Sequence, residues 1–288
     1  MTARTALLAA LGVLSAAFTV LWLVRLRTEG ARRPSAAELG VGFLTDFLDT
    51  LGIGSFAVTT ALYKLLRLVP DEDIPGTLNV GHAIPTFLEA FIFIAIVAVE
   101  GRTLVLMITA SVVGAWLGAG TVSRWPRRRI QWGMGVALIA AAGFFVMKNL
   151  GLFPGGGAAL GLSGAKLAVG LAFNFIFGAL MTLGIGAYAP CMILTSLLGM
   201  NPTTAFPIMM GSCAFLMPAA SIRFIRQKRY APGPALGLTV GGAPAVLLAA
   251  YVVKSLPLTA VRWLVIVVVL YTAVAMLRSA RSELNSSR

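Results

Sequence analysis

The sequence predicts an all-α, polytopic membrane protein made of two inverted repeats, and three observations support this prediction. Hydrophobic residues make up 58% of the 288 positions and charged residues only 11%, with a mean hydropathy of +0.90. Soluble domains carry about a quarter charged residues, so the composition indicates an integral membrane protein. The motif Leu-Gly-Ile-Gly occurs twice, and the arginines gather in short stretches between long apolar segments.

The repeated motif occupies residues 51–54 and 183–186, which are 132 positions apart. Residues 43–75 align with residues 175–207 without a gap, and 13 of the 33 aligned positions are identical. The chain therefore contains an internal duplication. In a membrane protein, such a duplication is typical of transporters.

Apolar segments follow one another along almost the whole chain, and a bilayer core about 30 Å thick needs roughly 20 residues per helical crossing. The nine segments lie near residues 5–26, 39–68, 76–99, 102–122, 129–150, 166–200, 203–225, 234–254 and 259–278. Segments 39–68 and 166–200 are too long for one straight crossing and too short for two, and the glycine motif interrupts both. We expect them to be re-entrant hairpins with arms of about 14 residues, whose turns lie beyond the bilayer midplane.

The positions of the basic stretches support the prediction of two re-entrant hairpins. If all nine segments crossed the membrane, residues 124–129 would lie on the opposite side from residues 25–33 and 223–229, against the positive-inside rule. With two re-entrant hairpins, every basic stretch is cytoplasmic, including the tail with Arg278 and Arg281. The N-terminus is then outside and the C-terminus is cytoplasmic.

The formal charge of +13 comes largely from these loops and does not indicate a nucleic-acid partner. The arginines of residues 124–129 stand beside Trp125 and Trp132, an arrangement typical of an interfacial anchor that faces anionic lipid. Segment 5–26 has most of its arginines after it, whereas a secretory signal has them before it. We therefore expect a retained transmembrane helix there.

Each predicted repeat holds one hairpin and three crossings, so the second copy is inverted relative to the first. The predicted parts are residues 1–34 (N-terminal transmembrane helix and cytoplasmic loop), 35–150 (first repeat), 151–164 (glycine-rich linker) and 165–288 (second repeat and short C-terminal tail). The linker lacks the ending of a phosphate-binding loop and is predicted to be a flexible external loop. The two hairpin tips should converge near the centre of the membrane.

The glycine breaks predict an anion site. Half-helices should resume from about Ser55 and Ala187, and helix N-termini carry partial positive charge and free N–H donors. Glycine admits a ligand close to the backbone, and hydroxyl groups add donors. The candidate substrate-binding residues are Thr50, Gly52, Gly54, Ser55, Thr182, Gly184, Gly186, Ala187 and Tyr188. The alternative is that the motif is a small-residue packing surface between helices.

Four ionisable residues of the first repeat are candidates for proton coupling, because such groups at membrane depth are costly and mark functional sites by default. Asp46 and Asp49 lie three apart on one face of the first hairpin's entering arm, and His82 and Glu89 lie seven apart on the next helix. The two aspartates are alternatively solvated near the cytoplasmic mouth, and His82 and Glu89 a structural pair. The matching positions of the second copy are Gly178, Met181, Ala214 and Ser221.

Asn79 and Cys213 are further cavity candidates. Cys213 and Cys191 are interpreted as buried apolar side chains, because a zinc site needs more ligands than this chain clusters. We expect no metal and no cofactor. One histidine and no compact set of nucleophile and base also argue against an enzyme. Lys148, near a predicted helix end, is expected to snorkel to the interface.

Both hairpin regions, with the stretches that follow them, carry a family resemblance. The stretches are residues 43–54 (FLTDFLDTLGIG), 74–82 (IPGTLNVGH), 183–191 (LGIGAYAPC) and 201–215 (NPTTAFPIMMGSCAF). They resemble the sulfite exporter TauE/SafE family of membrane permeases, also described as the toluene sulfonate uptake permease superfamily. This resemblance covers nearly the whole chain and implies a carrier of sulfur oxyanions, such as sulfite or organosulfonates, in the bacterial cell inner membrane.

Together these features predict a secondary-active permease for a small anion, bound at the midplane between the two hairpins and coupled to protons. Alternating access would come from one repeat rocking against the other. The expected partners are the small anionic substrate and the lipid bilayer. An anion channel, which would give linear unsaturable flux, and a membrane scaffold or enzyme without transport are the alternatives.

Overall fold

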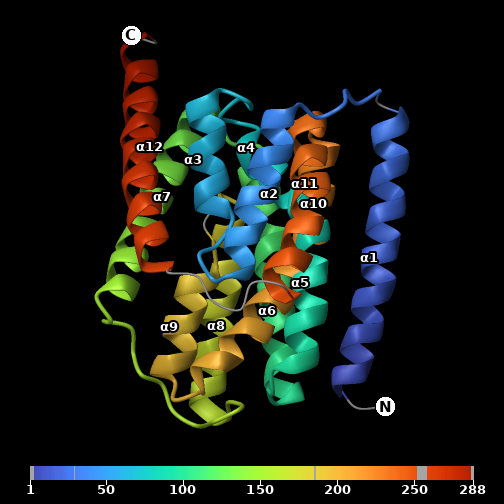
Figure 1. The fold of residues 1–288 in the computed structure, drawn as a ribbon, viewed down its shortest axis with the longest axis vertical. Coiled ribbons are helices and arrows are strands. Elements are labelled where there is room, and N and C mark those ends of the chain that lie inside the picture. The colour runs from blue at the N-terminus through green and yellow to red at the C-terminus, as the bar shows by residue number, and fades with distance from the viewer. Residues whose placement is uncertain (1–2, 29, 185, 252–257, 287–288) are drawn as a thin grey trace.

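The computed structural model describes residues 3–28, 30–184, 186–251 and 258–286, which form one bundle of helices (Figure 1). The helices are α1 (Ala3–Thr28), α2 (Ala36–Thr50), α3 (Phe56–Leu66), α4 (Ile74–Gly81), α5 (Ala83–Ile96), α6 (Gly101–Val122), α7 (Arg127–Asn149), α8 (Gly164–Met181), α9 (Tyr188–Leu197), the 3₁₀ helix η1 (Pro202–Thr204), α10 (Ala205–Arg226), α11 (Pro232–Tyr251) and α12 (Leu258–Ser286). Among the described residues, the only β pairing is an isolated bridge between Ala159 and Met200.

Seven helices in the described ranges are long and apolar enough to cross a membrane. They are α1, α6, α7, α8, α11, α12 and the unit of η1 with α10. Helices α4 and α5 pass the same test as a pair that is bent by 45°. The predicted class, an all-α polytopic membrane protein, is therefore confirmed.

The bend between α4 and α5 is a feature that the hydrophobic pattern of segment 76–99 does not predict. His82 ends one helix and begins the other. Pro85 follows three residues later, so it has no N–H for the carbonyl of Gly81, and its ring crowds that carbonyl. The hydroxyl of Thr239 on α11 donates to the Gly81 oxygen at 2.7 Å instead. A proline and a neighbouring hydroxyl together account for the bend.

The first hairpin consists of α2 and α3. Ser35 and Glu38 form a capping box that starts α2, because each side chain bonds the other's backbone N–H. The chain reverses at residues 51–55, where Gly52 and Gly54 adopt φ angles of +82° and +94°. Only glycine takes such angles without strain, so the motif ends one helix and permits the next to start.

The second hairpin consists of α8 and α9. Gly184 has a φ of +89°, close to that of Gly52, to which the duplication matches it. Ile185 of the second motif lies outside the described residues. The arms are unequal, since α8 has 18 residues and α9 has 10, whereas the sequence suggests similar lengths.

The hairpins are oriented in opposite directions and packed crosswise. Helices α2 and α3 lie in the upper part of Figure 1 with their connection near mid-height, whereas α8 and α9 lie in the lower part. Helix α2 packs on α11 and helix α8 packs on α6. A Cβ on Gly42 would come 2.6 Å from the Gly237 oxygen, and one on Gly178 would overlap the backbone of Ser111. Small residues thus bring each hairpin against a helix of the other half of the chain.

The glycine-rich linker, predicted to be a flexible loop, pairs with the connection after α9. Gly157 donates its N–H to the Met200 oxygen at 2.9 Å, and Asn201 donates to the Ala159 oxygen at 2.8 Å. Gly164, which the sequence assigns to the linker, is the first residue of α8. The linker backbone is therefore bonded to the second hairpin.

Helix α1 starts at the lower end of the bundle in Figure 1, and α12 finishes at the upper end. The terminal residues 1–2 and 287–288, for which we expect an outside N-terminus and a cytoplasmic C-terminus, lie outside the described residues. Residues 252–254, the end of predicted segment 234–254, lie outside them as well.

Candidate functional site

The two glycine turns meet at a pair of small cavities of about 30 Å³ and 20 Å³. Four residues line both cavities: Gly54 and Phe56 from the first hairpin, Gly186 and Tyr188 from the second. Phe56 and Tyr188 are the first residues of α3 and α9. The N-termini of two helices from different halves of the chain therefore face one space, and neither N-cap side chain forms a capping hydrogen bond.

Both cavities are too small for an oxyanion. A cavity needs about 10–15 Å³ of this kind of volume to hold one water molecule, so each has room for one or two. Apolar side chains supply most of the remaining lining, among them Phe144, Phe145 and Met209. The structure thus holds the space between the turns in a closed form, which must widen before an anion could enter.

The other sequence candidates fall into two groups around this space. Ser55, Ala187, Cys213 and Asp49 line the smaller cavity. Among the described residues that the sequence predicts to bind substrate, Thr50, Gly52, Thr182 and Gly184 line neither cavity. The Thr182 hydroxyl donates to the Ala179 oxygen at 2.7 Å, within its own helix end.

Asn79 lies away from the cavities. Its side-chain amide donates to the Pro75 oxygen at 2.8 Å on the same helix, and its Oδ1 has no hydrogen-bond partner in the described part of the chain. Both cysteines are free and buried, with Cys213 Sγ 3.4 Å from Met181 Sδ. The structure has no group of three or more His, Cys, Asp and Glu side chains that could hold a metal within its described ranges.

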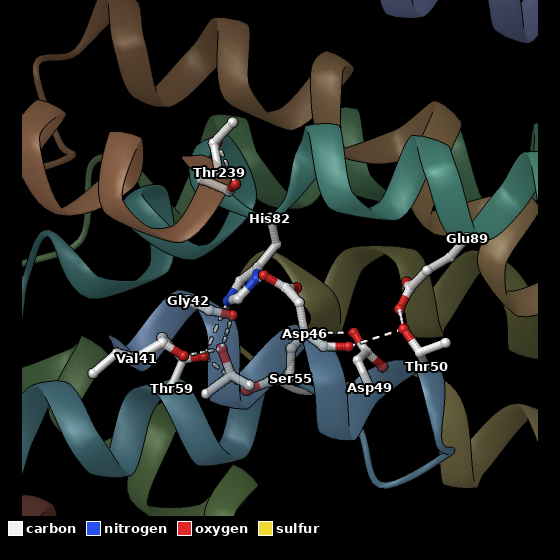
Figure 2. A network of polar contacts seen from close by, with 12 residues as sticks. Val41, Gly42, Asp46, Asp49, Thr50, Ser55, Thr59, His82, Glu89 and Thr239 are labelled. Atoms are coloured by element: carbon white, nitrogen blue, oxygen red, sulfur yellow. Dashed lines mark hydrogen bonds and ion pairs between the residues drawn. The ribbon is translucent and has the colours of Figure 1, made fainter. Parts of the chain in front are cut away.

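The four ionisable candidates are all buried and belong to one polar network on the inner face of the first hairpin (Figure 2). His82 Nδ1 lies 2.7 Å from Asp46 Oδ1, and His82 Nε2 lies 3.0 Å from the Thr59 hydroxyl. The bend between α4 and α5 places the imidazole there, between an acid of α2 and a hydroxyl of α3. His82 thus bridges the two arms of the hairpin.

The remaining two acids are held by hydroxyl groups at the end of α2 and at the turn. The Ser55 hydroxyl donates to Asp49 Oδ2 at 2.5 Å. The Thr50 hydroxyl lies 2.9 Å from the Asp46 backbone oxygen and 2.8 Å from Glu89 Oε1. A hydroxyl donates only one hydrogen bond, so both Thr50 contacts are satisfied together when Glu89 carries a proton and donates it.

Two carboxylate oxygens of this network, Asp46 Oδ2 and Glu89 Oε2, have no hydrogen-bond partner among the residues that the structure places. An ionised carboxylate buried without full pairing costs several kcal/mol. Both aspartates are buried, so the alternative that they are simply solvated near a cytoplasmic mouth does not fit this structure. His82 and Glu89 do not form a structural pair with each other, since His82 contacts Asp46 and Glu89 contacts Thr50.

Sequence reasoning, which predicts that Lys148 snorkels to the membrane interface, does not predict the contacts that this side chain makes. Its ammonium donates to the Gly52 oxygen at 3.0 Å and lies 4.7 Å from the centre of the Tyr188 ring. Lys148 therefore touches both hairpins at their turns. Its position near the end of α7 gives no signal for this contact, because the contact depends on how α7 packs.

These features define a class: a multi-pass helical membrane protein with a buried ionisable network in the first half, next to the cavities where two glycine-containing turns meet. Residues 1–145, half of the chain, match the family model described as "Sulfite exporter TauE/SafE". The chain therefore belongs to the TauE/SafE sulfite exporter family, a family of membrane transporters, and the resemblance is confirmed. No curated protein and no solved structure matches the chain.

Proposed function

We propose that this chain is a secondary-active carrier of a small sulfur oxyanion, sulfite or an organosulfonate, across the bacterial cell inner membrane. One observation carries the proposal: the uncapped N-termini of α3 and α9 face the same cavities. Free N–H groups and the positive ends of helix dipoles favour an anion. The family supplies the chemical class of that anion.

The polar network of the first hairpin is proposed to couple transport to protons. Asp49 lines the smaller cavity, and Asp46, His82 and Glu89 connect to it through Thr50 and Ser55 on the same hairpin. An anion beside ionised acids would be repelled, so uptake of a proton by the network favours anion binding. Proton and anion would then move together as the site opens to alternate sides.

Alternating access is proposed to come from the inverted arrangement of the two halves. The opposite orientation of the hairpins and their crosswise packing on α11 and α6 support it. The linker side is proposed to be external. Labelling of the single-cysteine variants Gly155→Cys and Arg129→Cys in intact cells, with Cys191 and Cys213 replaced, checks this. Only Gly155→Cys should react from outside, and labelling of Arg129→Cys from that side would contradict the proposal.

Reconstitution into liposomes tests transport. We expect saturable uptake of labelled sulfite or an organosulfonate, accelerated by a proton gradient. Gly54→Leu and Gly186→Leu should abolish it, because each side chain would fill the closed cavities, whereas Gly143→Leu on α7 enters open space and serves as the control. Absence of flux for every anion, or unchanged flux in both cavity variants, would overturn the proposal, and linear flux would indicate a channel.

A further inference from the structure

Lys148 and Arg262 form a pair of cations beside the first glycine turn that no acid neutralises within the described residues. Lys148 lies near the end of α7 and Arg262 near the start of α12, close enough for their charges to interact. Figure 1 places the start of α12 near mid-height. Neither side chain forms an ion pair with a carboxylate in the described part of the chain.

The contacts of both cations leave hydrogen-bonding capacity unused. Lys148 has three N–H donors and gives one to the Gly52 oxygen. Arg262 Nη1 donates to Asn149 Oδ1 at 2.8 Å, while its buried Nε has no partner among the described residues. Burial of a cation without an acid is costly, and one carbonyl with one aromatic ring satisfies Lys148 only in part, so an anion would stabilise it further.

The positive charge of Lys148 lies where it could contact an anion bound between the turns. The ammonium touches Gly52 of the first turn and the ring of Tyr188, which lines both cavities. Asp49 and Ser55 approach the smaller cavity from the network of the first hairpin. The cation and the acids thus come to the turns from different helices, with Lys148 on α7.

We propose that Lys148, supported by Arg262, binds the oxyanion and supplies its counter-charge. This rests on the proposed anion transport and adds the residue that the glycine motifs do not provide. In the closed form the Lys148 ammonium is bonded to the Gly52 oxygen. When the turns separate, the ammonium leaves that carbonyl and donates to the oxyanion, while Arg262 adds a second positive charge behind it.

A purely structural role is the competing interpretation, because a lysine in the last turn of a helix also interacts favourably with its carbonyl end. Lys166 offers a matched control. It donates to the Leu198 oxygen at 3.0 Å and joins the arms of the second hairpin, but it is exposed and touches neither turn. Lys148→Met and Lys166→Met therefore remove the same kind of bond at two places.

Transport kinetics in liposomes, with labelled sulfite as the probe, distinguish the two interpretations. Lys148→Met should raise KM about tenfold or more, the factor expected for the loss of one charge-assisted hydrogen bond. Lys148→Arg keeps the charge, so its KM should lie between those of the wild type and Lys148→Met. Arg262→Gln should raise KM by a smaller factor. Lys166→Met should leave KM unchanged. An unchanged KM in both Lys148→Met and Arg262→Gln would overturn the inference.

A binding measurement covers the case in which Lys148→Met does not fold or does not transport. Sulfite should raise the melting temperature of the detergent-solubilised wild type and of Lys166→Met. The sulfite-induced rise in melting temperature should be smaller for Lys148→Arg and Arg262→Gln. If the wild type binds or carries sulfite and these variants respond as it does, the inference fails and the transport proposal stands. If the wild type neither binds nor carries any anion of the panel, both fail.

Discussion

The two hairpins share a backbone plan and differ in the chemistry they carry. Asp46 on α2 and Gly178 on α8 occupy positions matched by the duplication, and both face the helix on which their hairpin packs. Asp46 meets Gly242 of α11, whereas Gly178 meets Ser111 of α6. In the first half the glycine at this contact, Gly242, belongs to the partner helix α11. In the second half the glycine, Gly178, belongs to the hairpin itself. Close packing is therefore common to both halves, while the room for an acid exists only in the first.

The helices that follow the two hairpins also differ: only the one in the first half carries a buried titratable group at a helix break. In the first half it is broken between α4 and α5, and His82 at the break reaches Asp46. In the second half the matching helix, α10, is continuous through Ala214, although it contains Pro218. The comparison teaches that the first half of the chain, its hairpin together with α4 and α5, holds the buried titratable groups. The second half supplies a matching glycine turn without them.

The largest effect is expected from breaking the packing that the hairpins share. Gly178→Leu would force a side chain into the backbone of Ser111, and Gly42→Leu would do so at Gly237 and Leu238. Overpacking of this kind destabilises by about 3 kcal/mol or more, because backbone cannot move aside as a side chain can. Melting temperature and monodispersity in detergent measure the loss. Gly40→Leu, which points into open space on α2, is the control, and equal stability of all three variants would contradict the packing.

Next in size is the loss of coupling, which should occur in one half only. Glu89→Gln keeps the shape of the side chain but takes up no proton, so the acceleration of uptake by a proton gradient should fall at least about tenfold, or 1.4 kcal/mol. Ser221→Ala at the matching position of α10 should leave the acceleration unchanged. A similar loss in both variants would mean that the coupling is not confined to the first half.

A smaller difference is expected between the two turns themselves. Gly52→Ala and Gly184→Ala both place a side chain at a φ above +80°, which costs about 1–2 kcal/mol. At Gly52 the added Cβ would also lie 2.6 Å from Tyr188 Oη, whereas at Gly184 the nearest atom is 3.4 Å away. Thermal unfolding should therefore rank Gly52→Ala as the more harmful. Adding Tyr188→Phe should recover part of that excess, and no recovery would argue against the contact between the turns.

The smallest effect concerns the start of each hairpin. Ser35 caps α2 through a reciprocal bond with Glu38, whereas Ser163 at the start of α8 makes no side-chain capping bond. Ser35→Ala should lower the free energy of unfolding by about 1 kcal/mol, and Ser163→Ala should have little effect. Equal melting temperatures for the two variants would show that the capping box does not stabilise the first hairpin.

Helix breaks are predictable from the sequence because their cause is local. Glycines inside segments of unusual length predict half-helices from about Ser55 and Ala187, and α3 and α9 start one residue after these positions. The four ionisable candidates follow from their chemistry alone. Both predictions need only the residues of one continuous stretch of the chain.

Contacts between distant segments are not predictable in this way. The bond from Lys148 to Gly52 depends on where α7 packs, and the Thr239 hydroxyl that satisfies the Gly81 carbonyl comes from α11. The hydroxyl of Thr182 makes it a candidate ligand from the sequence, yet that group bonds within its own helix end. Composition and spacing identify what a side chain is able to do, and tertiary packing decides which partner it meets.

The crosswise packing also has a consequence for how the chain is made. Asp46 and the glycine that gives it room, Gly242, lie 196 positions apart, so the first hairpin is synthesised long before its packing surface exists. Until α11 is inserted, the face of α2 with Gly42 and Asp46 Oδ2 lacks the surface on which it packs, although Asp46 can already pair with His82. The packing of the first hairpin on α11 can therefore form only after most of the second half has been synthesised.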